Sequence, residues 1–217
     1  MQKSGSPTYT AEEIERSKLS LKKYAVADLI VSPSQLKVLF VLESPHKDEF
    51  IHSHPAAGST GKKLSALFTK GFLSQFIPTE PIGCQIKKYN YPHLGIIETS
   101  NLPMDMDFYP CFLSSADKRL VQDLNYAKTR LEKRIQKRYI PNGIVEKYLI
   151  NNFSNRLNSI LRQSSNPVII ISFGHIAANF INTANVANLK LPHPTGTSWS
   201  NAEITLNIFN LSQSLLP

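Results

Sequence analysis

Residues 38–64 read VLFVLESPHKDEFIHSHPAAGSTGKKL, a run of five apolar residues followed by a polar loop. Continuous apolar runs of this length are typical of a strand that is buried on both faces of a sheet. The run stops at Glu43-Ser44-Pro45-His46, and the small residues Gly58 and Gly61 precede a helical pattern. Small residues let a ligand approach the backbone closely. The stretch therefore predicts a strand, a loop that presents a carboxylate and an imidazole, and the start of a helix.

The same pattern recurs along the chain. Apolar runs at 94–98, 168–172 and 189–191 predict three more strands, and helical patterns separate them. This order predicts an α/β fold, a three-layer α/β/α sandwich with a central, mostly parallel four-stranded sheet. Polar loops follow the strands, including Ser100-Asn101 and His193-Pro194-Thr195. Because ligands bind at the carboxyl ends of parallel strands, these loops are expected to converge there with the loop after residue 42.

The length of 217 residues favours a single domain, residues 1–217. We expect an N-terminal helical extension at about 8–30 and a basic helical insertion at about 114–140. The apolar residues of the insertion recur at helical intervals, and many lysines and arginines surround them. Residues 71–93 are rich in proline and aromatic residues and are interpreted as irregular surface. A further amphipathic helix is expected at 144–161, and a last helix between residues 200 and 211.

The formal net charge of +8 and the sequence pI of about 9.5 favour a polyanionic partner, nucleic acid ahead of a membrane surface. Cys84 and Cys111 lack CxxC spacing, so we expect neither a disulfide framework nor a cysteine-based metal site. The N-terminus has no signal pattern, and no apolar run approaches the roughly 20 residues that span a bilayer. We expect a cytoplasmic monomer, in a bacterial or phage-associated cytosol, with no membrane contact.

The loop motifs resemble those of the uracil-DNA glycosylase superfamily. One branch of it reads Gly-Glu-Ala-Pro-Gly, then Glu, then Pro-Phe-Val-Gly, Ala-Gly and Leu. This chain holds, in the same register, Leu42-Glu43-Ser44-Pro45-His46, Glu49, Pro55-Ala56-Ala57-Gly58, Thr60-Gly61 and Leu64. The later loops resemble the superfamily's Thr-Asn step and His-Pro-Ser loop, so the resemblance covers about residues 37–212. That branch usually carries an iron–sulfur cluster on four cysteines, which two cysteines cannot supply, so we expect no cofactor and no metal.

The resemblance implies a DNA glycosylase that flips a non-standard pyrimidine, uracil or a 5-modified base, out of duplex or single-stranded DNA and hydrolyses its N-glycosidic bond. Glu43 would stabilise the cationic sugar or direct a water, His193 would donate to the departing base, and Asn101 would read the base edge. No lysine lies in the three motifs to form a Schiff base, so a monofunctional enzyme that leaves an abasic site is expected.

The remaining residues that the resemblance implies fall into three groups. The base pocket would be formed by Ser44, Pro45, His46, Ala56 and Ser100. The DNA phosphates would be bound by Gly58, Gly61, Lys62 and Thr195, and the charged face of the basic insertion, not the resemblance, adds Lys128, Arg130 and Arg134 as phosphate contacts. Thr197 stands in the place of the family's intercalating Leu, so Trp199 or Leu191 is the candidate wedge.

Two departures from the family bear on the substrate. Ala56 replaces the Phe that stacks on the flipped base, and His46 stands where relatives have Gly or Tyr. Another ring could replace the Phe, with Phe50, Phe108 and Tyr109 as candidates. Alternatively, the pocket is wider, and the protein is a defence glycosylase for bulky modified cytosine in phage DNA, such as glucosylated hydroxymethylcytosine.

Ser44 stands where some relatives carry a catalytic Asp, so the catalytic carboxylate is expected to be Glu43, with Asp48 and Glu49 in reserve. Two other classes of function stay open. A non-catalytic DNA-binding module would keep the fold and the basic helix. A metal hydrolase would use the histidines at 46, 52 and 54, of which the last two form an HxH step.

Overall fold

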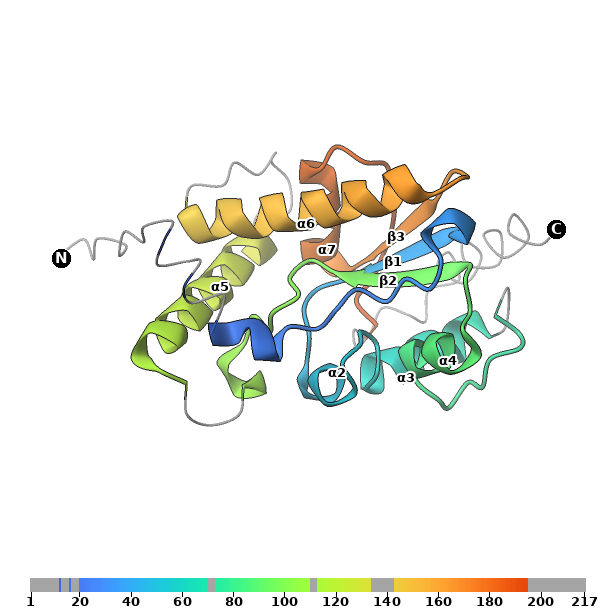
Figure 1. The fold of residues 1–217 in the computed structure, drawn as a ribbon, viewed down its shortest axis with the longest axis horizontal. Coiled ribbons are helices and arrows are strands. Elements are labelled where there is room, and N and C mark those ends of the chain that lie inside the picture. The colour runs from blue at the N-terminus through green and yellow to red at the C-terminus, as the bar shows by residue number, and fades with distance from the viewer. Residues whose placement is uncertain are drawn as a thin grey trace.

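A sheet of four parallel strands lies at the centre of the protein, with helices on both sides (Figure 1). The computed structural model describes Glu12, Arg16 and residues 20–69, 73–109, 113–133 and 143–194, without the side chains of Leu131 and Lys133. Within these residues the strand order is β2-β1-β3-β4. The α/β/α fold and the parallel sheet that the sequence predicts are confirmed.

The strands are β1 (Val38–Leu42), β2 (Leu94–Glu98), β3 (Ile169–Phe173) and β4 (Leu189–Leu191). The α-helices are α2 (Lys47–His52), α3 (Ser59–Phe68), α4 (Ile82–Tyr89), α5 (Ser115–Lys133), α6 (Ile144–Gln163) and α7 (Gly174–Thr183). Three 3-10 turns complete the described elements: η1 (Lys22–Tyr24), η2 (Pro33–Gln35) and η3 (Met106–Phe108). The four strands lie where the sequence predicts them, to within one residue.

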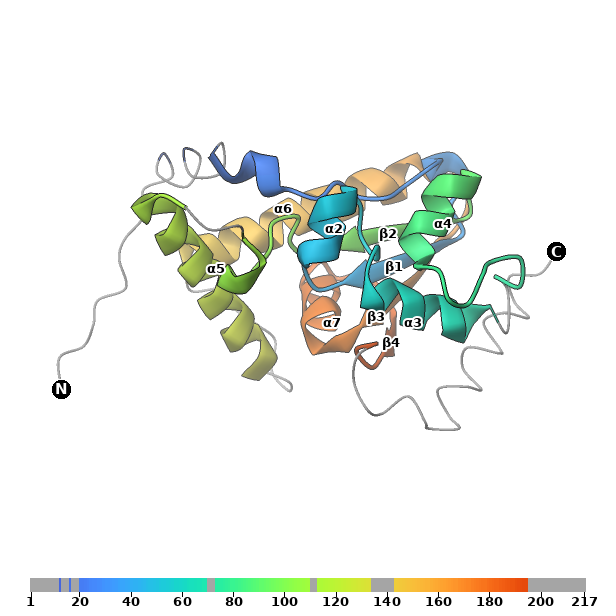
Figure 2. The ribbon, with the colours of Figure 1, turned by 90° about the horizontal axis from the view of Figure 1, so that it is seen from below.

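Both faces of the central strand β1 are buried, as its apolar run predicts. Successive side chains of a strand point to opposite faces, and here Phe40 and Leu42 join a cluster with α3 and α4. Leu39 and Val41 join a second cluster with α5, α6 and α7. The two views show these helix groups on opposite sides of the sheet (Figures 1 and 2). A continuous apolar run was required because neither face of the strand meets water.

The region between α3 and β2 is more regular than expected. Residues 71–93 were predicted to be irregular, but α4 occupies the second half of this segment. The helix follows Pro81 and buries Ile82 and Ile86 in the cluster beneath the sheet. Pro81 supports this start, because proline removes an N–H that a helix terminus would not use. The prediction was wrong because it took prolines as signs of irregular structure alone.

The two predicted helical additions are only partly described. In the N-terminal extension, residues 25–30 run extended after η1, and Leu29 forms an isolated antiparallel bridge with Ile96 of β2. The basic insertion contains α5, whose apolar side chains Leu120, Leu124 and Ala127 are buried against the core. The predicted last helix lies outside the described residues. No helix in the described part of the chain combines the length and apolarity that a membrane span requires.

Candidate active site

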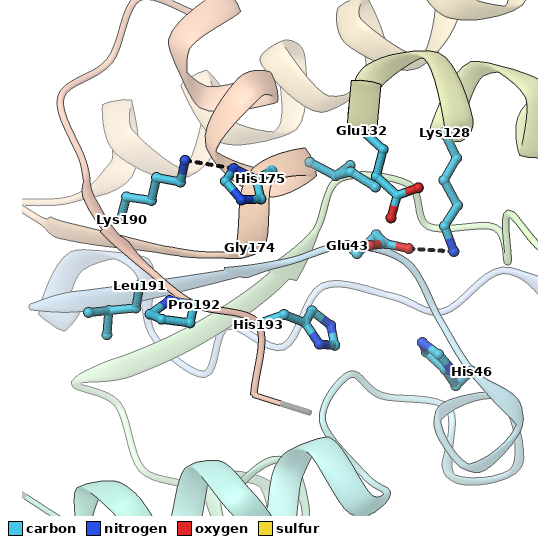
Figure 3. Close-up of a pocket in the computed structure, with 11 residues that line it drawn as sticks. Glu43, His46, Lys128, Glu132, Gly174, His175, Lys190, Leu191, Pro192 and His193 are labelled. Carbon is cyan, nitrogen blue, oxygen red and sulfur yellow. Dashed lines mark hydrogen bonds and ion pairs between the residues drawn. The ribbon is translucent and has the colours of Figure 1, made fainter. Parts of the chain in front are cut away.

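A cavity of about 640 Å³ opens at the carboxyl edge of the sheet. It is lined by Glu43, His46, Lys128, Glu132, Gly174, His175, Ile176, Lys190, Leu191, Pro192 and His193 (Figure 3). The first two lining residues follow β1, and the last follows β4, which is the convergence that parallel strands predict. The structure thus brings together five of the residues singled out from the sequence: Glu43, His46, Lys128, Leu191 and His193.

The carboxylate of Glu43 is held by a lysine from α5. Lys128 Nζ lies 2.7 Å from Glu43 Oε1, and the two side chains are 20% and 15% exposed. Burial acts to lower the pKa of Lys128, but the charge of Glu43 and its hydrogen bond outweigh burial, so that this pKa lies above its ordinary value. Lys128 is therefore an ammonium at neutral pH and holds a negative charge in place at the cavity wall.

Two imidazoles share the cavity with this ion pair. Partial desolvation at the cavity wall lowers the pKa of both His46 and His193 below the ordinary value of 6.5, although His46 keeps an exposed side, and the charge of Glu43 acts to raise both. The charge of Lys128 lowers both further. Each ring is therefore neutral at pH 7 and offers one N–H donor and one acceptor nitrogen. Neutral donors of this kind can bind an oxygen that becomes negative during a reaction.

The two histidines make this charge arrangement measurable. NMR titration of the ring signals should give midpoints below 6.5 for His46 and His193. Glu43→Gln removes the charge that favours the imidazolium, so both midpoints should fall further, whereas Lys128→Met should raise them. Assignment by His→Gln substitution identifies the signals. Midpoints at or above 6.5, or midpoints that do not change in Glu43→Gln, would contradict the placement of both histidines beside the charge of Glu43.

A second carboxylate, Glu49, organises the loop and does not reach the cavity. Glu49 is 3% exposed; its Oε2 accepts the backbone N–H of His46 at 2.6 Å, and its Oε1 accepts that of Ala56 at 2.9 Å. Both oxygens are thus used by the protein backbone. Glu49, a reserve catalytic carboxylate in the sequence analysis, is a positioning residue that fixes the backbone of His46 at the cavity.

Ala56 lies outside the cavity, although the sequence assigned it to the base pocket. Its side chain is fully buried in the cluster with α3 and α4. Its backbone adopts a left-handed conformation with φ +53°, held by Glu49. The absence of a Phe at this position therefore does not widen the cavity, because the position is part of the core.

Internal packing accounts for the two glycines that were assigned to phosphate binding. A Cβ on Gly58 would lie 2.4 Å from Oδ2 of Asp48, and one on Gly61 would lie 1.9 Å from the carbonyl oxygen of Ala56. A side chain at position 61 would collide with the backbone, whereas one at position 58 would displace the exposed side chain of Asp48. These glycines allow α3 to pack closely against the loop that precedes it.

The loop after β2 supports the site from behind. The hydroxyl of Thr99 donates to the carbonyl of Glu43, and the N–H of Ser100 lies 3.3 Å from the same oxygen. The hydroxyl of Ser100 donates to the carbonyl of Leu102, and the carbonyl of Asn101 accepts from Val26 N–H at 2.8 Å. This loop therefore fixes the backbone of Glu43. Four residues predicted for the site are not among those that line the cavity: Ser44, Pro45, Ser100 and Asn101.

Of the three rings proposed to replace the missing Phe, only one lies beside the cavity. The ring centroid of Phe108 is 4.3 Å from that of His46. Phe50 and Tyr109 instead pack on Tyr24, and the Tyr109 hydroxyl donates to the carbonyl of Pro103. Phe108 and His46 thus form an aromatic pair, of which His46 lines the cavity.

A pair of cavity residues was missed in the sequence. Lys190 of β4 and His175 in the first turn of α7 lie with Nζ and Nδ1 2.9 Å apart (Figure 3). A lysine ammonium only donates, so Nδ1 of His175 is the acceptor and the ring proton is on Nε2. His175 follows Gly174 directly after β3, so its place at the strand's carboxyl end was the signal that could have found it.

The predicted phosphate contacts are only partly exposed. Arg130 Nη1 lies 3.0 Å from Oε1 of Glu146, a side chain that is 4% exposed, while Lys62 is exposed in the first turn of α3. Phosphate contact by these residues and by Lys128 stays a prediction. Three further predicted residues, Arg134, Thr195 and Trp199, lie outside the described residues.

Comparison with models of known protein families finds no match for this chain, and comparison with curated proteins finds none. The function must therefore be inferred from the residues of the cavity and from the motifs that they form.

Proposed function

We propose that this protein is a monofunctional DNA glycosylase, related to the uracil-DNA glycosylase superfamily, which hydrolyses the bond between a non-standard pyrimidine and its deoxyribose. The observation that carries the proposal is the convergence of Glu43, His46 and His193 on one cavity at the carboxyl edge of a parallel sheet. Two of the motifs that resemble the superfamily supply these residues. The cavity volume lies within the range of pockets that enclose small organic ligands, roughly 300–1,000 Å³.

The charges of the cavity suit this reaction. As the glycosidic bond breaks, the sugar gains positive charge and the base leaves as an anion. The carboxylate of Glu43 stabilises the sugar or orients the attacking water, and Lys128 holds it in position. The neutral ring of His193 donates a hydrogen bond to the base oxygen, where charge develops.

Water is the nucleophile in this proposal. A lysine nucleophile would need a neutral amine, and no lysine of the three motifs is placed to form a Schiff base. The structure brings Lys128 into the cavity from α5, but the pKa of this lysine is raised by its partnership with Glu43. An ammonium has no lone pair for Schiff-base formation, so Lys128 does not serve as the nucleophile. The other lysine of the cavity, Lys190, has its Nζ 2.9 Å from Nδ1 of His175.

DNA is the proposed polyanionic partner. Lys62 and Lys63 are exposed on α3, and the charge of Lys63 acts on the ring of His193, so this helix lies close to the cavity. Phosphate contacts from these lysines would anchor the strand beside a flipped nucleotide. A salt-dependent affinity, weakened by Lys62→Gln with Lys63→Gln, is the expected consequence.

A bulky modified cytosine is a second candidate substrate, and the volume of the cavity favours it. About 640 Å³ is more room than a bare pyrimidine ring needs. The case no longer includes Ala56, which lies in the core. A defence glycosylase that excises glucosylated hydroxymethylcytosine from phage DNA would use the same residues for the same chemistry, with the added sugar in the remaining space.

The test is an abasic-site assay with two substrates, uracil-containing DNA and phage DNA with glucosylated hydroxymethylcytosine. We expect strand breaks only after alkali treatment, because a monofunctional enzyme leaves the backbone intact. Cleavage of the uracil substrate alone identifies a repair enzyme, and cleavage of the modified DNA alone identifies the defence function. Binding of both DNAs without an abasic product would replace the proposal with a non-catalytic DNA-binding module.

A further inference from the structure

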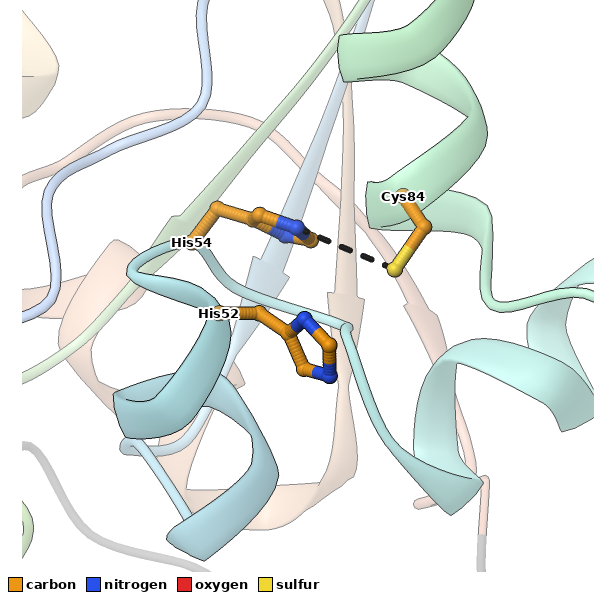
Figure 4. A group of neighbouring side chains, drawn as sticks. All are labelled: His52, His54 and Cys84. Atoms are coloured by element: carbon orange, nitrogen blue, oxygen red, sulfur yellow. Dashed lines mark hydrogen bonds between the residues drawn. The ribbon is translucent and has the colours of Figure 1, made fainter.

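Three potential metal ligands meet on the α2–α4 side of the protein. The ligand atoms of His52, His54 and Cys84 all lie within 4.8 Å of one another (Figure 4). His52 ends α2, His54 follows two residues later, and Cys84 is the third residue of α4. None of the three lines the candidate active site. We propose that they form a Zn²⁺ site, independent of the proposed glycosylase reaction.

The sequence divided these residues differently. It grouped His52 and His54 with His46 as a candidate metal set, and it assigned no metal to Cys84 because no second cysteine stands nearby in the chain. The structure places His46 in the cavity with Glu43 and brings Cys84 next to His54. The candidate metal ligands are therefore His52, His54 and Cys84, with Cys84 in place of His46.

The separations suit tetrahedral coordination. Zn²⁺ binds thiolate sulfur at about 2.3 Å and imidazole nitrogen at about 2.0–2.1 Å, which places such ligand atoms about 3.6 Å apart at a tetrahedral angle. Cys84 Sγ lies 3.8 Å from His54 Nε2. The ring of His52 lies nearby, with its centroid 6.0 Å from that of His54. Because this side chain is exposed, it can turn toward an ion held between Cys84 Sγ and His54 Nε2.

The buried ring of His54 already presents a lone pair to the cluster. Its Nδ1 lies 3.1 Å from the carbonyl oxygen of Pro55. A carbonyl only accepts, so Nδ1 carries the proton and Nε2, the atom nearest Cys84, is unprotonated in the neutral ring. Metal-binding histidines commonly donate their second N–H to a backbone carbonyl in this way, which fixes the ring and its tautomer.

Backbone contacts hold the two segments together before any metal binds. The N–H of Gly83 donates to the carbonyl of Ala56 at 3.1 Å. A Cβ on Gly83 would lie 2.0 Å from the carbonyl oxygen of Pro55, so only glycine allows α4 to come this close to the histidine loop. Cys84 is the next residue and is carried to His54 by this contact. The site needs little reorganisation to bind an ion.

The donor set determines the class of ion. One thiolate and two imidazoles suit a borderline-soft ion such as Zn²⁺, whereas Mg²⁺ and Ca²⁺ prefer oxygen ligands. Binding releases the thiol proton of Cys84 to solvent. Three protein ligands leave a fourth position for water, on the side where His52 is exposed. The bound ion ties the end of α2 to the start of α4 and stabilises the folded state by mass action.

The test uses the full chain without a histidine tag, dialysed first against EDTA. Calorimetric titration with Zn²⁺ should give one ion per chain, and a concentration 100-fold above the Kd should raise the Tm by about 5–10 °C. Co²⁺ in place of Zn²⁺ should give a sulfur-to-cobalt charge-transfer absorption. Cys84→Ser should abolish this absorption and weaken Zn²⁺ binding at least about 10-fold, and His52→Gln should weaken binding similarly.

Matched substitutions outside the cluster serve as controls. Cys111→Ser changes the other cysteine of the chain, and His93→Gln changes a half-buried histidine whose ring nitrogen is bonded to the carbonyl of Gln35. Both variants should keep the Zn²⁺ affinity and the sulfur-to-cobalt absorption of the unchanged protein. Absence of Zn²⁺ binding, Co²⁺ binding without the charge-transfer absorption, or equal affinity in Cys84→Ser would overturn the site. None of these readouts depends on glycosylase activity, so the two proposals can fail separately.

Discussion

Glu43→Gln should reduce the rate of base excision by about 100- to 1,000-fold, the scale expected when one well-placed electrostatic group is removed from an active site. Gln keeps the shape of the side chain but carries no charge to stabilise the sugar cation. Affinity for substrate DNA should change little, because the interaction matters most in the transition state. Single-turnover rates, together with equilibrium binding to the same DNA, separate the two quantities.

The ion pair requires a control for folding. Glu43→Gln leaves the ammonium of Lys128 without its partner in a largely buried position, and unpaired buried charges are destabilising. The double variant Glu43→Gln with Lys128→Met removes both charges, so we expect it to recover the Tm while the rate stays low. Recovery of the rate together with the Tm would show that Glu43 acts only through stability.

Glu132→Gln provides the matched chemical control. Glu132 is a second carboxylate of the cavity wall, but its side chain is exposed on α5. Its replacement should change the excision rate by less than about 3-fold, since an exposed charge is screened by solvent. Equal losses in Glu132→Gln and Glu43→Gln would contradict the specific role of Glu43.

Gly61→Ala should lower the free energy of unfolding by about 3 kcal/mol, at the upper end of the usual cost of overpacking. For a chain of this size the Tm should fall by about 6–12 °C. Ala normally stabilises a helix relative to Gly by roughly 1 kcal/mol, so helix propensity alone predicts the opposite sign. The steric effect prevails because the new Cβ would lie 1.9 Å from the carbonyl oxygen of Ala56, a backbone atom that cannot rotate away.

Urea unfolding and thermal melts measure this effect, with Gly143→Ser as the matched control. Gly143 precedes α6, and a Cβ added to it would have its nearest neighbouring atom 3.7 Å away, on Glu146. Serine is also a favourable residue at a helix N-cap. The control should therefore be neutral or slightly stabilising. A Tm for Gly61→Ala at or above that of the unchanged protein would contradict the packing of α3 on the loop.

Local patterns were sufficient for the sheet and for much of the helical structure. The apolar runs at 38–42 and 94–98 became strands at those residues, because a strand buried on both faces has no polar positions to interrupt the run. The helix expected at 144–161 was found as α6, since its apolar residues recur at helical spacing. The short helices α2 and α4 were not predicted, because six or eight residues carry too little periodicity to outweigh nearby prolines.

The candidate site was predictable only in part. Glu43, His46 and His193 directly follow strands, and parallel strands bring their carboxyl ends to one edge. Ala56 was misplaced because its role was taken from a motif, whereas a hydrogen bond to Glu49 and contacts from α3 turn the residue into the core. A wide pocket is therefore indicated by the volume of the cavity and no longer by the absence of a Phe at position 56.

The positions of the strands, the polar residues that end them and the meeting of those ends could all be predicted from the sequence, because these features depend on local apolar pattern and on strand direction. Three contacts became visible only in the folded protein: the ion pair of Lys128 with Glu43, the packing of Ala56 in the core, and the approach of Cys84 to His52 and His54. The reason is physical: contacts between distant segments depend on how helices pack on the sheet. That packing is set by the shapes of many side chains together, which no single stretch of sequence contains.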